Sequence, residues 1–206
     1  MLDKPKELYE QTRLLGKGPG EDIARQAAAE IVSAGTGLIC DIGAGEGRFS
    51  LLLSNRTVID FDLSLALLKL GRELNSDPVK PAVVGRLSQI PFRKGRFPWL
   101  VVLSVLENYP KTTVIIFLSN VLELLIPGGK LVASFRGGAS LRMRYREIRA
   151  GKKSIQFRFN ARKWLTTLNG EFQGYVIPLL PKPHGWRKLI GTPADARALL
   201  IVERLI

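Results

Sequence analysis

Residues 38–50, LICDIGAGEGRFS, place three glycines directly after a short apolar run. Residues 37–42 are apolar and β-branched, which predicts a buried strand. Gly43, Gly45 and Gly47 let the following loop bring backbone N–H groups close to a ligand, because no Cβ blocks the approach. We expect a helix after the loop, and its N-terminus would favour a negative group such as a phosphate or a carboxylate.

The spacing of the glycines separates two classes of ligand. Dinucleotide-binding loops have the pattern G-x-G-x-x-G, whereas this loop reads G-x-G-x-G and is preceded by Asp41. An acid at this position would repel a pyrophosphate but suits a ligand that carries an ammonium group. Because a buried carboxylate without a partner is costly, Asp41 is expected to serve a ligand.

A second acidic position follows the next apolar run, residues 56–61. Asp62 lies nineteen residues after Gly43, close to the offset of about 20 residues at which an acid binds ribose hydroxyls. Asp60 would share its face of the strand, but Asp62 is favoured because it lies at the strand end. The alternative role of Asp62 is to cap a helix over residues 63–74, for which Ser64 is another candidate cap.

Strand-like runs and helical patterns alternate along the chain, which predicts a parallel sheet covered by helices. The further strands expected in it are residues 81–85, 99–105 and 129–135, and the helices are residues 21–32, 63–74 and 113–125, the last stopping at residues 127–129. A terminal antiparallel hairpin is expected from residues 172–178 and 196–206. The fold class is therefore α/β: a Rossmann-like three-layer sandwich with a mostly parallel seven-stranded sheet.

We expect a single domain, because the chain has 206 residues and no linker or internal repeat is visible. Its parts would be N-terminal helices, a cofactor-binding core, a basic insertion, and a C-terminal helix with the strand hairpin: residues 1–35, 36–135, 136–163 and 164–206.

Five segments in order resemble the motifs of one enzyme family over residues 20–135. They read DIGAGEG, VIDFDLSLALLKLGRE, VVGRLSQIPF, LSVLENYP and LELLIPGGKLVAS. The chain resembles the class I S-adenosylmethionine-dependent methyltransferases, of the small type similar to the ubiquinone and menaquinone biosynthesis methyltransferases. The resemblance implies S-adenosyl-L-methionine as cofactor, S-adenosyl-L-homocysteine as product, and no metal.

The resemblance also implies a role for each cofactor residue. Asp41 would lie near the methionyl ammonium and Asp62 would hold the ribose hydroxyls. The remaining residues would contact the methionyl chain (Gly43, Ala44, Gly45, Gly47, Leu103 and Ser104) or the adenine (Leu63, Arg86 and Leu87).

Two positions depart from the family pattern. Arg86 stands where an acid usually contacts the adenine amine, and arginine offers no acceptor. Asn108 stands where related enzymes often have a histidine, so it cannot act as a general base. The candidate catalytic residues are therefore Glu107 and His184. The candidate substrate residues are Tyr109, Arg136, Arg142, Arg146 and Trp186.

The net charge of +13 is concentrated in two segments. Residues 136–163 and 179–195 together hold thirteen basic and two acidic residues, a net charge of +11. If residues 172–178 run parallel to the earlier strands, both segments border the carboxyl ends of the strands, where ligands of open α/β sheets bind. We therefore expect an anionic partner there; the alternative is a solvated basic face.

Composition limits the remaining possibilities. One cysteine, Cys40, and one histidine, His184, argue against a disulfide framework and a Cys- or His-rich metal site. The charged start MLDKPKELYE and the absence of an apolar run of about 18 residues predict a cytoplasmic protein without a transmembrane segment.

The primary hypothesis is methyl transfer by in-line displacement to a small or lipid-like anionic acceptor. The alternatives are an RNA methyltransferase that uses the basic segments, and a non-catalytic scaffold with the cofactor fold. No RNA-binding motif or Asn-Pro-Pro-Tyr-type motif is visible in the sequence.

Overall fold

The computed structural model describes residues 19–53, 55–74, 80–136, 161–168, 170–179 and 197–206. Along the chain, the described elements are α2 (Pro19–Ser33), β1 (Ile39–Ile42), η1 (Ser50–Leu53), β2 (Val58–Asp62), α3 (Leu65–Leu74), β3 (Ala82–Val84), β4 (Phe97–Val102), η2 (Leu106–Asn108), α4 (Lys111–Leu122), β5 (Leu125–Arg136), α6 (Ala161–Leu165), β6 (Phe172–Leu179) and β7 (Arg197–Arg204).

The strands form one seven-stranded sheet in the order β3-β2-β1-β4-β5-β7-β6. β1 to β5 pair in parallel. β7 is antiparallel to both of its neighbours, β5 and β6. The predicted α/β class, the mostly parallel sheet and the terminal antiparallel hairpin are therefore confirmed.

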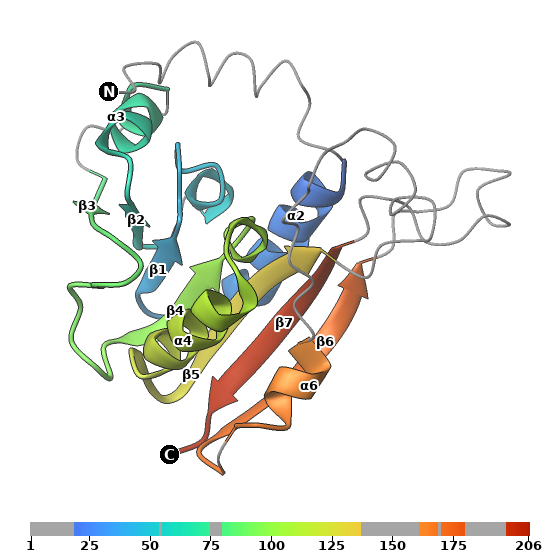
Figure 1. The fold of residues 1–206 in the computed structure, drawn as a ribbon. Helices are drawn as coiled ribbons and strands as arrows, with labels where there is room; N and C mark the ends of the chain where they lie inside the picture. Colours follow the sequence, from blue (N-terminus) through green and yellow to red (C-terminus); the bar gives the residue numbers. More distant parts are fainter. Residues whose placement is uncertain (1–18, 54, 75–79, 137–160, 169, 180–196) are drawn as a thin grey trace, which may run out of the picture.

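Helices cover both faces of the sheet (Figure 1). α2 and η1 pack on one face, where they share a core with strand residues such as Ile39 and Val101. α4 and α6 pack on the other face, against Cys40 and Leu100. Successive strand residues point to opposite faces, so a sheet covered on both sides needs continuous apolar strands, and this is why the strands are recognisable as apolar runs.

The segment after the glycine loop differs from the predicted helix. The backbone turns from Gly45 to Phe49 and then forms only the four residues of η1. Gly45 and Gly47 have φ angles of 59° and 74°, which a right-handed helix cannot contain. The Ser50 hydroxyl donates to the Gly47 carbonyl oxygen at 2.8 Å and holds the turn. The expected helix N-terminus is therefore absent, and the N–H groups of Gly43, Ala44, Gly45 and Gly47 all donate to other groups of the protein.

The predicted end of the third helix and start of the fifth strand are also shifted. α4 ends at Leu122 instead of at Leu125, and β5 begins at Leu125 instead of at Gly129. The pairing of β5 with β4 is interrupted by a bulge between Leu125 and Lys130. Gly128, with a φ angle of 75°, lies inside this bulge, so the Pro-Gly-Gly sequence bends a strand and does not stop a helix.

The terminal strands determine where the basic segments begin. Arg136 at the end of β5 and Leu179 at the end of β6 both pair with Arg197 at the start of β7. β6 is therefore parallel to β5, and the chain enters both basic segments at the carboxyl edge of the sheet. Residues 1–18 of the predicted N-terminal helices and nearly all of both basic segments lie outside the described residues.

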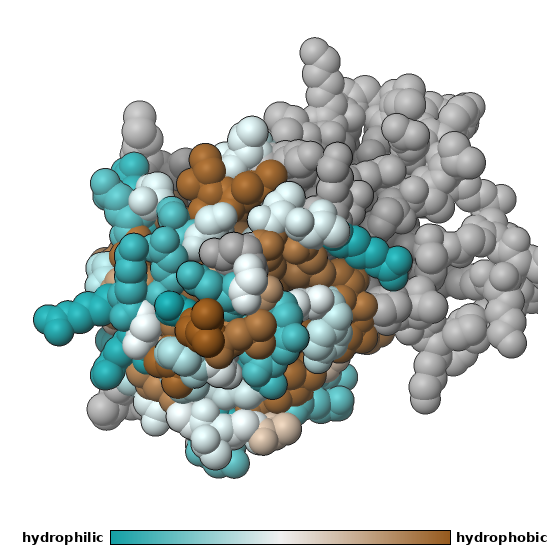
Figure 2. Space-filling view, turned by 90° about the horizontal axis from the view of Figure 1, so that it is seen from below, coloured by the Kyte–Doolittle hydropathy of each residue, from teal (hydrophilic) through white to brown (hydrophobic). Residues whose placement is uncertain are grey.

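The surface of the described part carries exposed hydrophobic residues on several elements. Leu51, Ile116 and Tyr175 are each more than half exposed. In the view from below, hydrophobic areas lie among hydrophilic ones (Figure 2). No helix in the described ranges is long and apolar enough to cross a membrane.

Candidate functional site

The glycine loop lies over the ends of β1 and β2. The backbone N–H groups of Gly43 and Ala44 both donate to the carbonyl oxygen of Phe61, at 2.7 and 3.2 Å. A Cβ on Gly43 would overlap the side chain of Val105, so this glycine permits a close approach to the end of β4. A Cβ on Gly45 would meet nothing within 4 Å, so its positive φ, and not lack of space, favours glycine there.

Asp62 joins this loop to the end of β2. Its Oδ2 accepts a hydrogen bond from the backbone N–H of Gly45 at 2.8 Å, and its Oδ1 accepts one from the backbone N–H of Ser64 at 2.8 Å. Ser64 caps α3, because its hydroxyl oxygen accepts a bond from the N–H of Leu67 at 3.2 Å. The helix-capping role therefore belongs to Ser64, and Asp62 is held at the site by two backbone groups.

Asp41 lies near the end of β1, and only 2% of its surface is exposed to solvent. Burial raises the pKa of its carboxyl group well above the ordinary value, and the neighbouring Asp60 carboxylate adds to the increase. Lys80 and Arg25 act in the opposite direction on this pKa. The protein therefore keeps a carboxyl group in its interior at the position where the sequence predicts a cationic ligand group.

Asp60 has a different role from Asp62. Its carboxylate forms an ion pair with Lys80 at 2.6 Å and accepts a hydrogen bond from Ser50 at 3.5 Å. Burial raises the pKa of Asp60, and its hydrogen bond to Lys80 opposes that increase. A Cβ on Gly47 would lie 2.7 Å from both the Asp60 carboxylate and the Lys80 ammonium. This pair therefore supports the glycine loop from below, which agrees with the choice of Asp62 as the ligand-facing acid.

The end of β4 is held in an uncommon backbone conformation. Ser104 has a φ angle of 60°, a left-handed conformation that is rare for residues other than glycine. Its N–H donates to the hydroxyl of Ser134, a fully buried residue of β5, at 2.9 Å. Its carbonyl oxygen accepts a bond from the side-chain amide of Asn108 at 3.0 Å. Asn108 thus orients the strand end.

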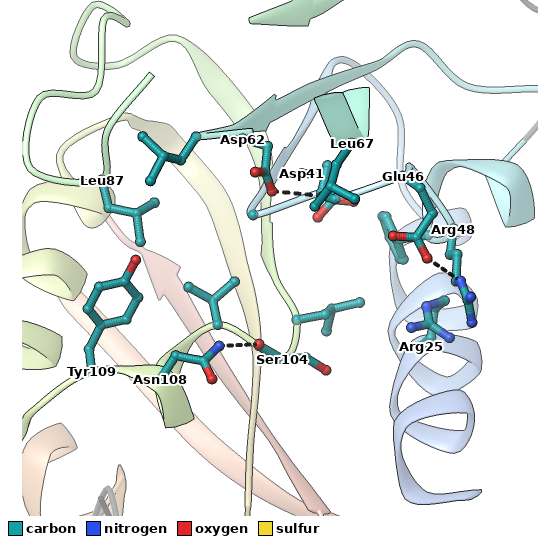
Figure 3. A pocket seen from close by; sticks show the side chains of 17 residues that line it. Arg25, Asp41, Glu46, Arg48, Asp62, Leu67, Leu87, Ser104, Asn108 and Tyr109 are labelled. Carbon is teal, nitrogen blue, oxygen red and sulfur yellow. Dashed lines mark hydrogen bonds and ion pairs between the residues drawn. The ribbon is translucent and has the colours of Figure 1, made fainter. Parts of the chain in front are cut away.

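Together these elements line a cavity of about 270 Å³ at the carboxyl ends of β1, β2 and β4 (Figure 3). Its lining includes most of the predicted cofactor residues and one predicted substrate residue: Asp41, Gly43, Ala44, Gly45, Asp62, Leu63, Leu87, Leu103, Ser104 and Tyr109.

Three predicted site residues lie elsewhere in the described structure. Gly47 is buried above the Asp60–Lys80 pair. Arg86 is exposed and lines a neighbouring cavity. Glu107 is half-buried on η2 and is not among the described lining residues of either cavity.

Sequence reasoning missed two arginines and one acid that line the cavity. Arg25 reaches it from α2, and Arg48 forms an ion pair with Glu46 beside it (Figure 3). The helical pattern of residues 21–32 predicts an apolar face but does not say which polar side chain reaches the end of the sheet. Glu46 could have been noticed, because it lies between two loop glycines.

The remaining substrate and catalytic candidates are not tested by the described side chains. Arg142, Arg146, His184 and Trp186 lie outside the described residues, and only the backbone position of Arg136 is described. The described ranges contain no cluster of three or more His, Cys, Asp or Glu side chains that could hold a metal ion.

The comparisons with known proteins agree with this geometry. Residues 40–133 match the family of methyltransferase domains, and this range runs from β1 to β5 and includes the glycine loop, Asp62 and the end of β4. The family match over this range and the shared fold support the predicted resemblance to the class I S-adenosylmethionine-dependent methyltransferases. The nearer likeness of this methyltransferase to the quinone-biosynthesis enzymes stays a prediction. No curated relative matches the sequence.

Solved methyltransferase structures share the fold at low sequence identity. The N-methyltransferase NodS from Bradyrhizobium japonicum, in complex with S-adenosyl-L-homocysteine, is 18% identical with a TM-score of 0.65, and 92% of this chain and 89% of that chain are covered. The magnesium protoporphyrin IX methyltransferase from Synechocystis, also with bound SAH, is 17% identical with a TM-score of 0.68, and 96% and 94% are covered. At this identity the likeness establishes the methyltransferase fold alone.

Proposed function

We propose that this methyltransferase uses S-adenosyl-L-methionine to methylate an anionic acceptor that is small or lipid-like, with release of S-adenosyl-L-homocysteine. One observation carries the proposal. The Gly45 N–H donates to the Asp62 carboxylate at 2.8 Å, which joins the loop after β1 to the acid after β2 at the edge of one cavity.

The residues that line the cavity fit this cofactor. A carboxylate has about four acceptor sites, so Asp62 can accept two ribose hydroxyls in addition to its two backbone donors. Asp41 supplies a buried counter-charge for the methionyl ammonium. Arg25 and Arg48 supply cations toward α2 for the methionyl carboxylate. Leu63 and Leu87 supply apolar contacts for the adenine.

The bound cofactor supplies an activated methyl group, so the protein's main task is to orient the acceptor and to exclude water. Ser104 and Asn108 fix the backbone at the end of β4, and Tyr109 lines the same cavity with its hydroxyl directed toward Leu87 (Figure 3). A base is needed only where the acceptor carries a proton of high pKa. Glu107 and His184 stay the predicted candidates for that step.

The anionic acceptor is supported by the distribution of charge. The two basic segments hold +11 of the net +13, and the register of β5, β6 and β7 brings Arg136, Leu179 and Arg197 to the same edge as the cavity. An acceptor with an acidic group would be attracted to this edge.

Calorimetry with S-adenosyl-L-homocysteine tests the proposal. We expect wild-type protein to bind it, and Asp62→Ala to bind it about tenfold to a hundredfold more weakly, because hydrogen bonds to a charged group are lost. Glu73→Ala, an exposed acid on α3, is the matched control and should bind as wild type does. An absence of binding by folded wild-type protein, or equal binding by Asp62→Ala, would overturn the proposal and favour a non-catalytic scaffold.

RNA is the second candidate acceptor, and the same charge distribution favours it. A basic edge next to a methyl-transfer cavity could hold phosphates. The two candidates differ in the salt dependence of binding and in which cell fraction accepts the methyl group.

A further inference from the structure

Ser104, which follows β4, is the one residue other than glycine in the described ranges that has a positive φ angle. A left-handed conformation is unfavourable for a residue with a side chain, and it persists only where surrounding contacts hold it. Ser104 lines the cavity assigned to the cofactor, together with Gly43 and Val105. The groups that hold Ser104 therefore act on the shape of this cavity.

Ser134 provides one of these contacts from the core of the sheet. It is fully buried and is the only polar residue in the buried run Leu131–Phe135 of β5. The pairing of β4 with β5 ends at Val102 and Ala133. Two residues later the Ser104 N–H donates to the Ser134 hydroxyl at 2.9 Å, so a side chain takes the place of a strand carbonyl group. A polar group in a core is costly unless it makes such a bond.

Ser104 is held by a second bond and is packed against the glycine loop. Its carbonyl oxygen accepts a hydrogen bond from the side-chain amide of Asn108 at 3.0 Å (Figure 3). The next residue, Val105, occupies the space that a Cβ on Gly43 would need. A change of the backbone at Ser104 would therefore move Val105 relative to the glycine loop, in the part of the cavity assigned to the methionyl chain.

We infer that Ser134 is a positioning residue for cofactor binding: its hydroxyl group keeps Ser104 left-handed and thereby fixes the turn after β4 against the glycine loop. Ser134 is not among the described lining residues of the cavity, so it acts through Ser104 and not on the cofactor itself. The inference rests on the proposed function, which assigns the cavity to this cofactor. It also gives Asn108 a role that needs no base, because its amide supports the same residue.

Calorimetry with S-adenosyl-L-homocysteine measures the effect on binding. Ser134→Ala should bind this ligand about tenfold more weakly, because the Ser104 N–H loses its acceptor. Val132→Ala is the matched control, since Val132 is also fully buried on β5 and lies on the same face of the sheet. The control should lower the midpoint of urea unfolding and bind the ligand as wild type does. Equal weakening of binding in both variants would indicate a general loss of core packing and overturn the inference.

A Ser104→Gly background separates positioning from packing. Glycine adopts a positive φ angle without support, so Ser134→Ala should weaken binding only about twofold in this background, compared with about tenfold in the wild-type background. A coupling of this size is usual for residues in contact. An equal loss in the two backgrounds would contradict the inference.

Asn108→Ala supplies a second cycle that leaves Ser104 unchanged. Because Asn108 and Ser134 hold the same residue, the double variant should lose less affinity than the product of the two single losses. Losses that simply multiply would show that the two side chains act independently, and the inference would then be wrong.

The same titrations distinguish this inference from the proposed function. If folded wild-type protein does not bind S-adenosyl-L-homocysteine, the proposed function fails, and the inference fails with it. If wild type binds the ligand and Ser134→Ala binds it equally well, the proposed function stands and only the role of Ser134 is refuted.

Discussion

Asp41 keeps a carboxyl group inside the protein at the end of β1, beside Asp60. Two buried acids in close proximity disfavour simultaneous ionisation, and Lys80 compensates mainly Asp60, with which it forms the ion pair. The raised pKa of Asp41 is therefore a cost to stability that a cationic ligand group would relieve. A residue that is unfavourable for folding and lines a cavity is typical of a binding site.

Replacing this residue should separate stability from binding. At pH values below the ordinary carboxyl pKa, Asp41 is protonated in both the folded and unfolded states. As pH rises, the unfolded state ionises first, so the free energy of unfolding falls with pH until the folded carboxyl group also ionises. We expect Asp41→Asn to flatten this decline, to be more stable than wild type at pH 7, and to bind S-adenosyl-L-homocysteine about tenfold more weakly.

Urea unfolding between pH 4 and pH 8, with calorimetry of the ligand, measures both effects. Glu30→Gln, an exposed acid on α2, is the control and should change neither of them. If Asp41→Asn lowers stability at pH 7 or binds the ligand as wild type does, the assigned role of Asp41 is wrong.

At the scale of elements, the loop between β1 and η1 is shaped by what lies beneath it. Gly47 has a φ angle of 74° and sits directly over the Asp60–Lys80 ion pair. Gly128, in the bulge of β5, has a φ angle of 75° and open space around the position of a Cβ. The two glycines thus share a backbone conformation and differ in their surroundings.

These two positions form a matched pair for substitution. Gly128→Ala should cost about 1 kcal/mol of unfolding free energy, from the positive φ angle alone. Gly47→Ala should cost about 1–3 kcal/mol more, because its Cβ also displaces a buried ion pair. It should also weaken binding of S-adenosyl-L-homocysteine, whereas Gly128→Ala should not. Urea denaturation measures the first difference and calorimetry the second, and equal losses in the two variants would contradict the supporting role of the ion pair.

The sequence predicts the strands, and it places Asp62 at a strand end, because both features follow local rules. Apolar runs predict buried parallel strands, and the offset of Asp62 from Gly43, at the end of one of these runs, predicts its ribose-binding role. Ser64 was also recognised as a helix cap from its position. Such features depend on a few neighbouring residues, so a single sequence is enough to find them.

The features that the sequence did not reveal depend on distant partners. Arg25 lines the cavity only because α2 packs on one face of the sheet, against strands that are distant in the sequence. Ser104 is held in a left-handed conformation by Ser134, which belongs to another strand. The missing helix after the glycine loop has a local cause, the positive φ angles of Gly45 and Gly47, but glycine in a sequence permits such angles without requiring them.

For the molecule as a whole, the topology decides how the charge can act. The sequence places both basic segments at the carboxyl edge only if β6 runs parallel to β5. The two strands do run parallel, because each is antiparallel to β7. The core with its cofactor motifs is close to neutral, and the basic residues are concentrated in the segments that begin at the carboxyl edge of the sheet. The anionic acceptor proposed above depends on this arrangement.

The acceptor class can be tested with cell extract and S-adenosyl-L-methionine that carries a labelled methyl group. We expect the label in a small-molecule or lipid-extractable fraction and not in RNA. Arg142→Gln together with Arg146→Gln should lower the labelling about tenfold while S-adenosyl-L-homocysteine binding stays unchanged, because two charges that attract the acceptor are removed. Lys69→Gln with Arg93→Gln, at exposed positions outside both basic segments, should label as wild type does.

The salt dependence of tRNA binding provides an independent check on that result. A small anionic acceptor involves few ion contacts, so we expect tRNA to bind weakly and with a shallow slope of log affinity against log salt concentration. An RNA substrate would instead give a steep slope, and each removed arginine that contacts a phosphate would reduce it by about one. Two results together would contradict the small acceptor: a steep salt slope that becomes shallower in the Arg142→Gln, Arg146→Gln variant, and label in RNA. The basic segments would then be assigned to binding of a nucleic acid.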